Sequence, residues 1–396
     1  MRFRFRHILG IVVALAFGLI MFSFPYSAFD RISSVMTFTR EEFGSLELGR
    51  LSVGGVHAVS GGGNKINAVV KYGFIPVKNV QLNIVNEKSV RVGGVPIGFT
   101  MYTEGVIVVG ISDVKTAEGF KKPFQNSDLR VGDVIQKIGG ERIGSAADID
   151  AMINSSANTG KAISIELSRR GAEVQITAQP ALDAATGRYK LGVWIRDNTA
   201  GVGTLTYVKE GGRFGALGHP ITDIDTGTIL PVRSGDVYNC SIVGVQKSER
   251  GVPGELKGIF LRGGKKIGTL DKNNKFGVFG TLDSIPDNGI CRAPVPVANR
   301  GSVKPGKATI LTTIGSETGQ YDIEIIKTNY QKSSDDKSMI IKITDRKLLD
   351  KTGGIVQGMS GSPIMQNGKI VGAVTHVFLN DASKGFGVYL DWMYEE

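Results

Sequence analysis

Short apolar runs alternate with glycines along most of this chain. The runs are short and rich in valine and isoleucine, a pattern that is typical of β-strands bounded by turns. Glycine accounts for 54 of the 396 residues, which fits a chain with many tight turns. Long apolar stripes at helical spacing do not occur in the sequence of residues 181–396. The pattern therefore predicts a mainly β protein.

One long apolar run lies near the N-terminus. Ile8 to Phe24 carries no charge and follows the basic segment MRFRFRH. A run of this length is at the lower limit for crossing a bilayer, and a secretory signal peptide begins in the same way. A signal removed after Ala28 needs a small residue where Tyr26 stands. We therefore predict a signal anchor over residues 1–29 that places the rest of the chain outside the cytoplasm, with a removed leader as the alternative.

The hydrophobic pattern divides the rest of the chain into three segments. Residues 30–90 form a small β-rich segment without recognisable chemistry, and residues 91–180 form a separate unit. In that unit we predict a helix over Ala147–Ile153, because its apolar residues recur at helical spacing. The strands expected there are Glu104–Ile111, Ile163–Leu167 and Glu173–Ala178. Residues 181–396 carry strand-like runs at Leu191–Ile195, Gly203–Val208, Ile242–Val245, Ile259–Leu261, Ala308–Thr313, Tyr321–Ile326 and Met339–Ile343.

The unit over residues 91–180 resembles a PDZ domain. The segment LRVGDVIQKIGGERI, Leu129–Ile143, carries the resemblance. The turn Pro96-Ile97-Gly98-Phe99 stands where PDZ domains carry their carboxylate-binding loop. The resemblance implies that backbone N–H groups of this loop bind a peptide that adds as a β-strand. The polar insert Lys115–Ser127 departs from the pattern, and a PDZ fold that acts only as a spacer is the alternative.

Composition excludes several classes of function. Lys and Arg number 47 and Asp and Glu 37, a net charge of +10, yet no basic run is interleaved with aromatic residues as in nucleic-acid-binding segments. Two cysteines are too few for a four-thiolate zinc site, and the four histidines show no HExxH spacing. We expect no nucleic acid, no metal and no cofactor.

The strongest local motif is Gly358-Met359-Ser360-Gly361-Ser362-Pro363. A serine between glycines suits a tight turn that exposes the hydroxyl group and aims backbone N–H groups at one point. The motif resembles the nucleophile turn of chymotrypsin-like proteases, which implies an oxyanion hole made by the N–H groups of Gly358 and Ser360. A plain turn between two strands is the alternative. Gly354, six residues before the serine, implies no selection for a charged substrate side chain.

A serine nucleophile needs a base. Outside the leader the imidazoles are those of His57, His219 and His376. His219 ends a strand-like run, FGALGHP, where a side chain faces a cleft easily, and it precedes the serine as in chymotrypsin. We predict His219 as the base. His376, which follows the run Ile370–Val374, remains the alternative.

The base needs a group that orients it, usually a carboxylate. The candidates are Asp223, Asp225, Asp345 and Asp350. Asp223 and Asp225 follow His219 so closely that they reach its ring with difficulty. Asp345 follows the strand-like run Met339–Thr344 and is preferred among the four on spacing alone, although without further information a solvated turn residue is the favoured interpretation of each of these carboxylates.

Long motifs carry a wider resemblance. LGVWIRDNTAGVGTLT (Leu191–Thr206), FGALGHPITDIDTG (Phe214–Gly227) and ITDRKLLDKTGGIVQGMSGSPI (Ile343–Ile364) resemble the stage IV sporulation protein B peptidases of endospore-forming bacteria. The resemblance implies a serine endopeptidase with a chymotrypsin-like double β-barrel over residues 181–396. It also implies a catalytic set of His219, Asp345 and Ser360.

The same resemblance implies a role in sporulation. Members of this family are exported from the forespore into the space between the two spore membranes. There they cleave themselves and a regulatory subunit of a membrane-embedded metalloprotease complex, which releases processing of a late mother-cell sigma factor. The PDZ domain is implicated in recognition of the substrate and of a second copy in trans. The alternative is a non-catalytic PDZ adaptor whose protease-like domain only binds.

Overall fold

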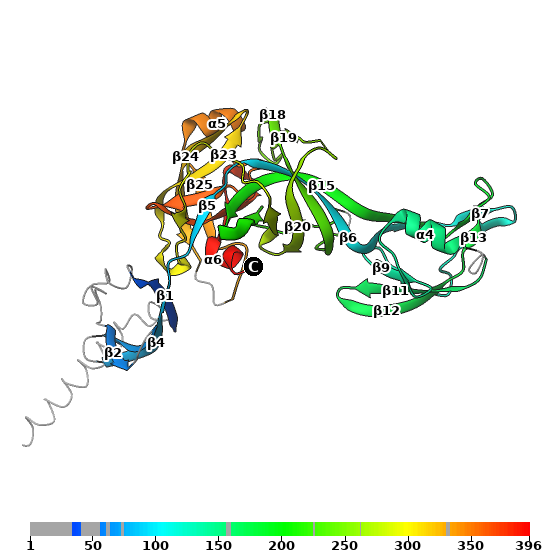
Figure 1. The fold of residues 1–396 in the computed structure, drawn as a ribbon, viewed down its shortest axis with the longest axis horizontal. Coiled ribbons are helices and arrows are strands. Elements are labelled where there is room, and N and C mark those ends of the chain that lie inside the picture. Colours follow the sequence, from blue (N-terminus) through cyan, green and yellow to red (C-terminus); the bar gives the residue numbers. More distant parts are fainter. Residues whose placement is uncertain are drawn as a thin grey trace, which may run out of the picture. The chain divides into compact units, whose positions relative to one another are not determined.

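The computed structural model describes residues 34–40, 56–60, 64–72, 75–155, 160–224, 226–261, 263–329 and 333–396. Most of them lie in β-strands, so the expectation of a mainly β protein is confirmed. The chain divides after Glu87 into two compact units (Figure 1). Within the described ranges no helix has the length and apolar character needed to span a bilayer. The predicted anchor, residues 1–29, lies outside those ranges.

The first unit contains a four-stranded sheet in the order β1-β4-β3-β2. Its strands are β1 (Val35–Thr39), β2 (Val56–Ser60), β3 (Lys65–Tyr72) and β4 (Ile75–Val85). Alternate residues of β3 and β4 face one side, where Ala68 lies opposite Val80 and both are buried. This period of two is the usual signature of a sheet with one covered face.

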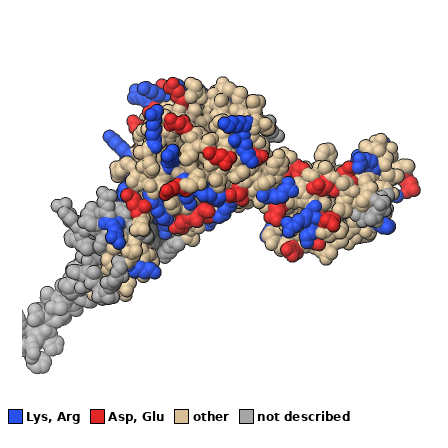
Figure 2. All heavy atoms as spheres, in the orientation of Figure 1, with Lys and Arg blue, Asp and Glu red and all other residues tan. Residues whose placement is uncertain are grey.

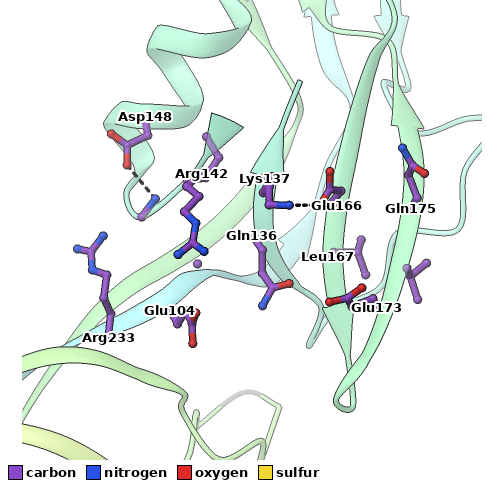
Figure 3. A pocket seen from close by; sticks show the side chains of 14 residues that line it. Glu104, Gln136, Lys137, Arg142, Asp148, Glu166, Leu167, Glu173, Gln175 and Arg233 are labelled. Carbon is purple, nitrogen blue, oxygen red and sulfur yellow. Dashed lines mark hydrogen bonds and ion pairs between the residues drawn. The ribbon is translucent and has the colours of Figure 1, made fainter. Parts of the chain in front are cut away.

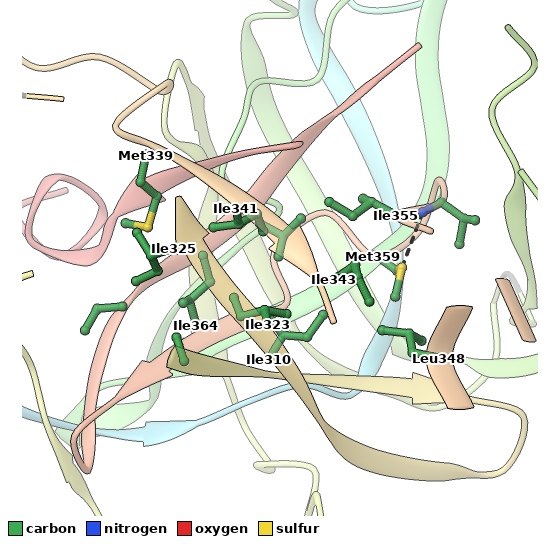
Figure 4. Packing of buried hydrophobic residues seen from close by; sticks show 14 of the residues in the cluster. Ile310, Ile323, Ile325, Met339, Ile341, Ile343, Leu348, Ile355, Met359 and Ile364 are labelled. Carbon is green, nitrogen blue, oxygen red and sulfur yellow. Dashed lines mark hydrogen bonds between the residues drawn. The ribbon is translucent and has the colours of Figure 1, made fainter. Parts of the chain in front are cut away.

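The C-terminal part of the second unit is a closed six-stranded barrel in the order β23-β24-β25-β28-β27-β26. Its strands are β23 (Gly306–Ile314), β24 (Glu317–Thr328), β25 (Met339–Ile343), β26 (Pro363–Gln366), β27 (Lys369–Phe378) and β28 (Asp381–Tyr389). On β24, Ile323 and Ile325 point into the core while Glu324 between them is exposed. Figure 4 shows these isoleucines packed with Met339 and Ile364 inside the barrel. Helix α6 (Leu390–Tyr394) follows the last strand.

A second ring of six strands lies before this barrel in the sequence. It runs β6-β17-β20-β21-β16-β15, and a further pairing of β15 with β6 returns to the start. The strands are β6 (Pro96–Ile111), β15 (Val193–Val208), β16 (Arg213–Ala216), β17 (Val232–Asn239), β20 (Lys266–Asn274) and β21 (Gly277–Leu282). Phe99, Leu205 and Phe214 are buried in its core. The pairings thus close a second ring, which precedes the barrel of β23 to β28 in the sequence.

Smaller elements attach to this ring. Strand β5 (Ser89–Val92) pairs with the end of β15, and β22 (Val295–Pro296) pairs with β5. The hairpin of β18 (Ser241–Gln246) and β19 (Glu255–Ile259) is inserted between β17 and β20. Two single turns of 3-10 helix occur at Glu210–Gly212 and Arg300–Ser302.

The PDZ part has its own sheet and core. The second half of β6 pairs with β9 (Val134–Ile138), which pairs with β11 (Ile163–Arg169), and β11 pairs with β12 (Ala172–Ala178). Helix α4 (Ala146–Ile153) begins at Ser145, whose hydroxyl accepts the N–H of Asp148. The predicted helix and the predicted strands Ile163–Leu167 and Glu173–Ala178 are present within one or two residues, whereas the strand predicted from Glu104 begins at Pro96. The short strands here are β7 (Val114–Thr116), β8 (Gly119–Lys121), β10 (Glu141–Arg142), β13 (Ala181–Leu182) and β14 (Tyr189–Lys190).

Strands β6 and β15 belong to both the ring and the PDZ part. The first half of β6 pairs with β17 and β15 in the ring, and its second half pairs with β9 in the PDZ sheet. The PDZ part is therefore inserted between the first two strands of the ring. The structure thus adds a strand to the double-barrel domain from outside the range 181–396. On the face seen in Figure 2, basic and acidic side chains are intermixed, so the positive net charge forms no single patch there.

Candidate active site

Ser360 lies in the turn that joins helix α5 (Arg346–Thr352) to β26. Gly358 and Gly361 on either side both have a φ of +93°, a conformation that favours glycine. A Cβ at position 361 would lie 2.2 Å from the carbonyl oxygen of Thr204, so only glycine fits this close approach. Met359 anchors the turn because its side chain is fully buried in the barrel core, where its Sδ accepts the N–H of Val356 at 3.3 Å (Figure 4).

Strand β15 of the other ring holds the turn from outside. The Thr204 hydroxyl donates to the carbonyl of Gly358 at 2.7 Å, and the Thr204 N–H donates to the carbonyl of Ser360 at 3.1 Å. The hydroxyl of Thr206 donates to the carbonyl of Gly361 at 2.8 Å. The carbonyl groups of Gly358, Ser360 and Gly361 therefore all face β15. The nucleophile turn is thus fixed by both barrels.

Two N–H groups at this turn are left unbound. Within the ranges that the structure describes, neither the N–H of Gly358 nor that of Ser360 has a hydrogen-bond partner. By contrast, Met359 donates to Val356 at 3.1 Å and Gly361 donates to Val374 at 2.8 Å. Two fixed, unpaired donors beside a nucleophile are what an oxyanion hole requires. Gly358 and Ser360 remain the predicted donors.

His219 follows β16 in a turn with two left-handed residues, Leu217 and Gly218, each with a φ of +71°. Its Nδ1 lies 2.9 Å from the carbonyl oxygen of Pro220. A carbonyl only accepts, so Nδ1 carries the proton and the Nε2 lone pair is free to take another. Burial lowers the pKa of His219, while the Pro220 hydrogen bond acts in the opposite direction. The ring is thus held in the tautomer of a general base.

Ser360 and His219 both contact β27. The hydroxyl of Ser360 donates to the carbonyl of Thr375 at 2.8 Å. The next residue, His376, has its ring 5.0 Å from the ring of His219, centroid to centroid. A Cβ at Gly218 would touch the Thr375 side chain at 3.0 Å, so the two segments are in direct contact. The structure therefore brings His219, His376 and Ser360 together, with the hydroxyl turned to a carbonyl rather than to an imidazole.

Asp345 has another task in this structure. It is the N-cap of α5, where Oδ1 accepts the N–H of Leu348 at 3.0 Å. Its Oδ2 lies 3.5 Å from the N–H of Asp322. Among the described residues, no carboxylate accepts a hydrogen bond from His219. The predicted pairing of Asp345 with His219 is therefore not formed here, because the carboxylate is turned to the backbone at the start of α5.

The other carboxylates considered from sequence do not replace it. Asp223 is buried, forms an ion pair with Arg196 and accepts the N–H of Thr226 at 2.9 Å. Asp350 is exposed on α5, and Asp225 lies outside the described residues. Sequence reasoning missed Asp336, whose Oδ2 lies 4.0 Å from Nδ1 of His376. No motif marks Asp336, since it stands in the polar segment SSDDKS.

A cleft opens beside the unbound N–H of Gly358. It has a volume of about 430 Å³ and lies between β15 and β19. Gln357 binds the hairpin strand on both sides of Glu255, because its carbonyl accepts the N–H of Leu256 at 2.9 Å and its N–H donates to Gly254 at 2.8 Å. The cleft therefore adjoins the turn that carries Ser360. Its lining consists of Ala200, Gly201, Val202, Glu255, Leu256, Gly258, Ile259, Phe260, Gln357 and Gly358.

Gly354 has a structural role rather than a place in this cleft. Its φ is +142°, and a Cβ there would lie 2.2 Å from the carbonyl oxygen of Ala382. Glycine at this position is required by the close approach of β28. Its presence therefore carries no information about the charge of the substrate.

The predicted PDZ loop requires a correction. Pro96–Phe99 forms the start of β6, which pairs with β15 on one edge and with β17 on the other. Ile97 and Phe99 are buried in the core of the ring, and a Cβ at Gly98 would lie 2.2 Å from the ring of Phe260. A strand with both edges paired offers no place for a peptide. The assignment of Pro96, Ile97, Gly98 and Phe99 to peptide binding is therefore wrong in this structure.

Another cleft lies on the PDZ sheet and has a volume of about 680 Å³ (Figure 3). Lys137 and Glu166 form an ion pair of 2.6 Å across two neighbouring strands in its wall. Figure 3 shows Arg142, Gln136 and Glu104 directed into the same space. The cleft is polar and open, as suits a peptide with charged side chains.

Comparisons with known proteins agree with this arrangement. The family profile of SpoIVB peptidase S55 matches residues 187–394, and that of the PDZ domain matches residues 93–179. No curated protein matches the chain.

Several solved structures are similar in part. The PDZ domain of the SdrC-like protein from Listeria monocytogenes is 23% identical over 23% of this chain and 87% of its own, with a TM-score of 0.18. The Rv3671c protease from M. tuberculosis in its active form is 13% identical over 50% of this chain and 72% of its own, with a TM-score of 0.29. The HtrA-type protease AlgW with a decapeptide is 13% identical over 50% of this chain and 52% of its own, with a TM-score of 0.30.

The peptidase profile covers just over half of the chain, including the turn at Ser360 and the histidine at position 219. The PDZ profile covers β6 and most of the part inserted between β6 and β15. The chain therefore belongs to the SpoIVB peptidase S55 family and is a serine endopeptidase with a PDZ domain.

Proposed function

We propose that Ser360 is the nucleophile and His219 the general base of this peptidase. The observation that carries the proposal is the pair of unbound N–H groups at Gly358 and Ser360, in contact with the segment that presents His219. The serine hydroxyl first turns from the carbonyl of Thr375 towards the imidazole. Its Oγ then attacks the peptide carbonyl while Nε2 of His219 takes the proton.

The two N–H groups stabilise the oxyanion that forms. His219 next gives its proton to the leaving amine, and the acyl-enzyme at Ser360 is hydrolysed when the same imidazole takes a proton from water. Throughout, the carbonyl of Pro220 accepts from Nδ1 and keeps Nε2 as the reacting nitrogen. No cofactor takes part in these steps.

A fluorophosphonate tests this assignment without a known substrate. The reagent reacts with an activated serine, so incubation with the full chain and peptide mapping should place the label on Ser360. Ser360→Ala provides the matched control, and Ser362→Ala tests the neighbouring serine, which is fully buried. An unlabelled wild-type chain that is folded would support a non-catalytic PDZ adaptor instead.

For the biological role, we propose signalling during sporulation. Family membership and the long motifs support export towards the space between the two spore membranes and cleavage of a regulatory subunit of a membrane-embedded metalloprotease complex. Self-cleavage and a membrane anchor over residues 1–29 belong to the same proposal. Membrane fractions washed with high salt should retain the full-length Ser360→Ala chain. Its complete release, with a new N-terminus beyond Phe29, would contradict the anchor.

The PDZ cleft of Figure 3 is proposed as the place where protein substrate, or a second copy in trans, is recognised. Its polar lining supports this, because Arg142 and Arg233 lie beside Glu104 and Glu173 and offer charges of both signs to an extended segment. Arg142→Glu should lower cleavage of the protein substrate and self-cleavage in trans while leaving fluorophosphonate labelling unchanged. Equal rates of protein cleavage in wild type and variant would leave the PDZ part as a spacer.

A further inference from the structure

A second imidazole packs against His219, and the inference from this contact rests on the proposed roles of His219 and Ser360. The ring of His219 meets the ring of His376 at 5.0 Å and an interplanar angle of 39°. His376 directly follows Thr375, whose carbonyl accepts the serine hydroxyl at 2.8 Å. The His376 side chain is therefore the one imidazole, among the described residues, that packs against the base.

His376 has an unsatisfied nitrogen that faces a carboxylate. Its Nδ1 is buried and has no hydrogen-bond partner within the described ranges. Oδ2 of Asp336 lies 4.0 Å from that nitrogen. A buried polar nitrogen without a partner is costly, and a movement of about 1 Å would turn this contact into a hydrogen bond. Asp336 lies in the segment before β25, so three parts of the chain converge here.

Charges around His376 favour a neutral ring. Burial, followed by the neighbouring His219 and Lys337, lowers the pKa of His376 to about 4. A neutral imidazole has one N–H, and a carboxylate at Nδ1 determines that the proton resides there. Burial and the hydrogen bond that Asp336 shares with Asp335 raise the pKa of Asp336, whose Oδ2 faces the His376 ring.

We propose that Asp336 and His376 together position His219. Asp336 accepts the Nδ1–H of His376 and fixes that ring, and the fixed ring packs against His219 so that its Nε2 is directed at the Ser360 hydroxyl. When His219 takes up the serine proton, the negative charge of Asp336 lies one ring away and stabilises the imidazolium. Asp336 and His376 are positioning residues, because they act through His219 and touch no substrate.

The test measures the second-order rate of fluorophosphonate labelling at Ser360 in the full-length chain. Asp336→Asn and His376→Phe should each slow labelling by about 10- to 100-fold, less than the loss from removing a carboxylate in direct contact with a catalytic histidine. The double variant should be no slower than the slower single variant, because the two residues act as one unit. Asp336→Glu should recover part of the rate. Asp350→Asn, an exposed carboxylate on α5, is the matched control and should label as wild type.

The pH profile separates positioning from a structural role. The groups that face His376 are His219 from the turn after β16 and Asp336 and Lys337 from the segment before β25. On β28, Lys384 and Asp381 are paired with each other at 2.8 Å. Loss of the Asp336 charge removes stabilisation of the imidazolium. The acid limb of the labelling rate should therefore move to lower pH in Asp336→Asn and not in Asp350→Asn.

Two results would overturn the proposal. The first is a folded Asp336→Asn chain that labels at the wild-type rate with an unchanged pH profile. The second is a double variant whose loss equals the product of the two single losses, since independent residues multiply. If Asp336→Asn does not fold, the wild-type rate in His376→Phe has the same meaning. A wild-type chain without label at Ser360 contradicts the proposed function itself, which keeps the two failures distinct.

Discussion

The two strand rings present the catalytic residues in different ways. The barrel that carries Ser360 is built from β23 to β28, which follow one another in the sequence without an inserted domain. The ring that presents His219 takes its first strand, β6, from before the PDZ part and the rest from behind it. The glycine conformations and the buried Met359 of the turn at Ser360 come from residues close together in the sequence, whereas its carbonyl groups are bound by Thr204 and Thr206 of β15. The ring that presents His219 depends on the pairing of β6 with β15, and the whole PDZ part lies between these two strands in the sequence.

The contrast extends to how each residue is held. Ser360 sits between two glycines in left-handed conformations and behind a buried Met359, all within four residues. His219 is held by the carbonyl of its own neighbour, Pro220, and by a ring from β27 of the other barrel. A local motif can thus predict a nucleophile, whereas the partners of a base come from anywhere in the fold.

The largest expected effect comes from removing either the proposed nucleophile or the proposed base. Ser360→Ala and His219→Ala should each lower the rate of peptide cleavage by about 10⁴- to 10⁶-fold, because nucleophile and base act as one unit. The double variant should be little slower than either single variant. Rates of cleavage of a protein substrate by purified chains measure this. Appreciable activity in Ser360→Ala would remove the serine from its role.

The second-largest effect concerns the contact between Thr204 of β15 and the turn that carries Ser360. Gly361→Ala places a Cβ 2.2 Å from the Thr204 carbonyl and strains a φ of +93°. We expect a loss of at least about 100-fold in labelling, because a displacement near 1 Å at a reacting group costs this much. Gly368→Ala is the control: its φ is +75° and no atom lies within 4 Å of the added Cβ. Equal rates in the two variants would show that the close contact is unimportant.

A smaller effect distinguishes the helix cap from a catalytic carboxylate. Asp345→Ala removes the side chain that accepts the Leu348 N–H and should lower the free energy of unfolding by about 1 kcal/mol. Asp345→Asn keeps a capping oxygen, so stability and labelling should both stay near wild type. Denaturant unfolding and labelling rates measure the two. A loss near 10⁴-fold in a stable Asp345→Asn chain would restore this residue to the triad.

The smallest effect is a shift of the pH profile. The base must be unprotonated to accept the serine proton, and burial lowers the pKa of His219. The acid limb of the labelling rate should therefore lie below the usual histidine value of about 6.5. Activity should persist as the pH falls to that value and be lost only below it. An acid limb above it would mean that the imidazolium is stabilised by a nearby charge more strongly than burial destabilises it.

Some residues of the site lie where the sequence predicts them and others do not, for identifiable reasons. The turn at Ser360 and the histidine that ends a strand both follow from local signals. Asp345 was preferred on its distance from the serine, although the residues after it, RKLLDK and then Gly353, are a helix with an N-cap and a glycine C-cap. That capping signal predicts the contact that the structure shows. The spacing between Asp345 and Ser360 in the sequence does not determine which group the Asp345 carboxylate contacts.

The segment Pro96–Phe99 was misread in the opposite way. Its glycine and proline indicate a loop, and by itself it fits the loop of a PDZ domain. In the fold both of its edges are paired, so the same residues become an interior strand. Pairing partners about 100 and 140 residues away decide this, and no local pattern records them.

The sequence by itself determined the β class, the PDZ part, the nucleophile turn and the strand end that presents His219. These depend on residues close together along the chain, through side-chain alternation, glycine conformations and motif spacing. The tertiary structure alone decided that Thr204 clamps the turn, that His376 packs on the base and that Asp336 faces His376 while Asp345 does not face His219. Such contacts join segments from different strands and rings, and their distances are set by packing after the chain has folded.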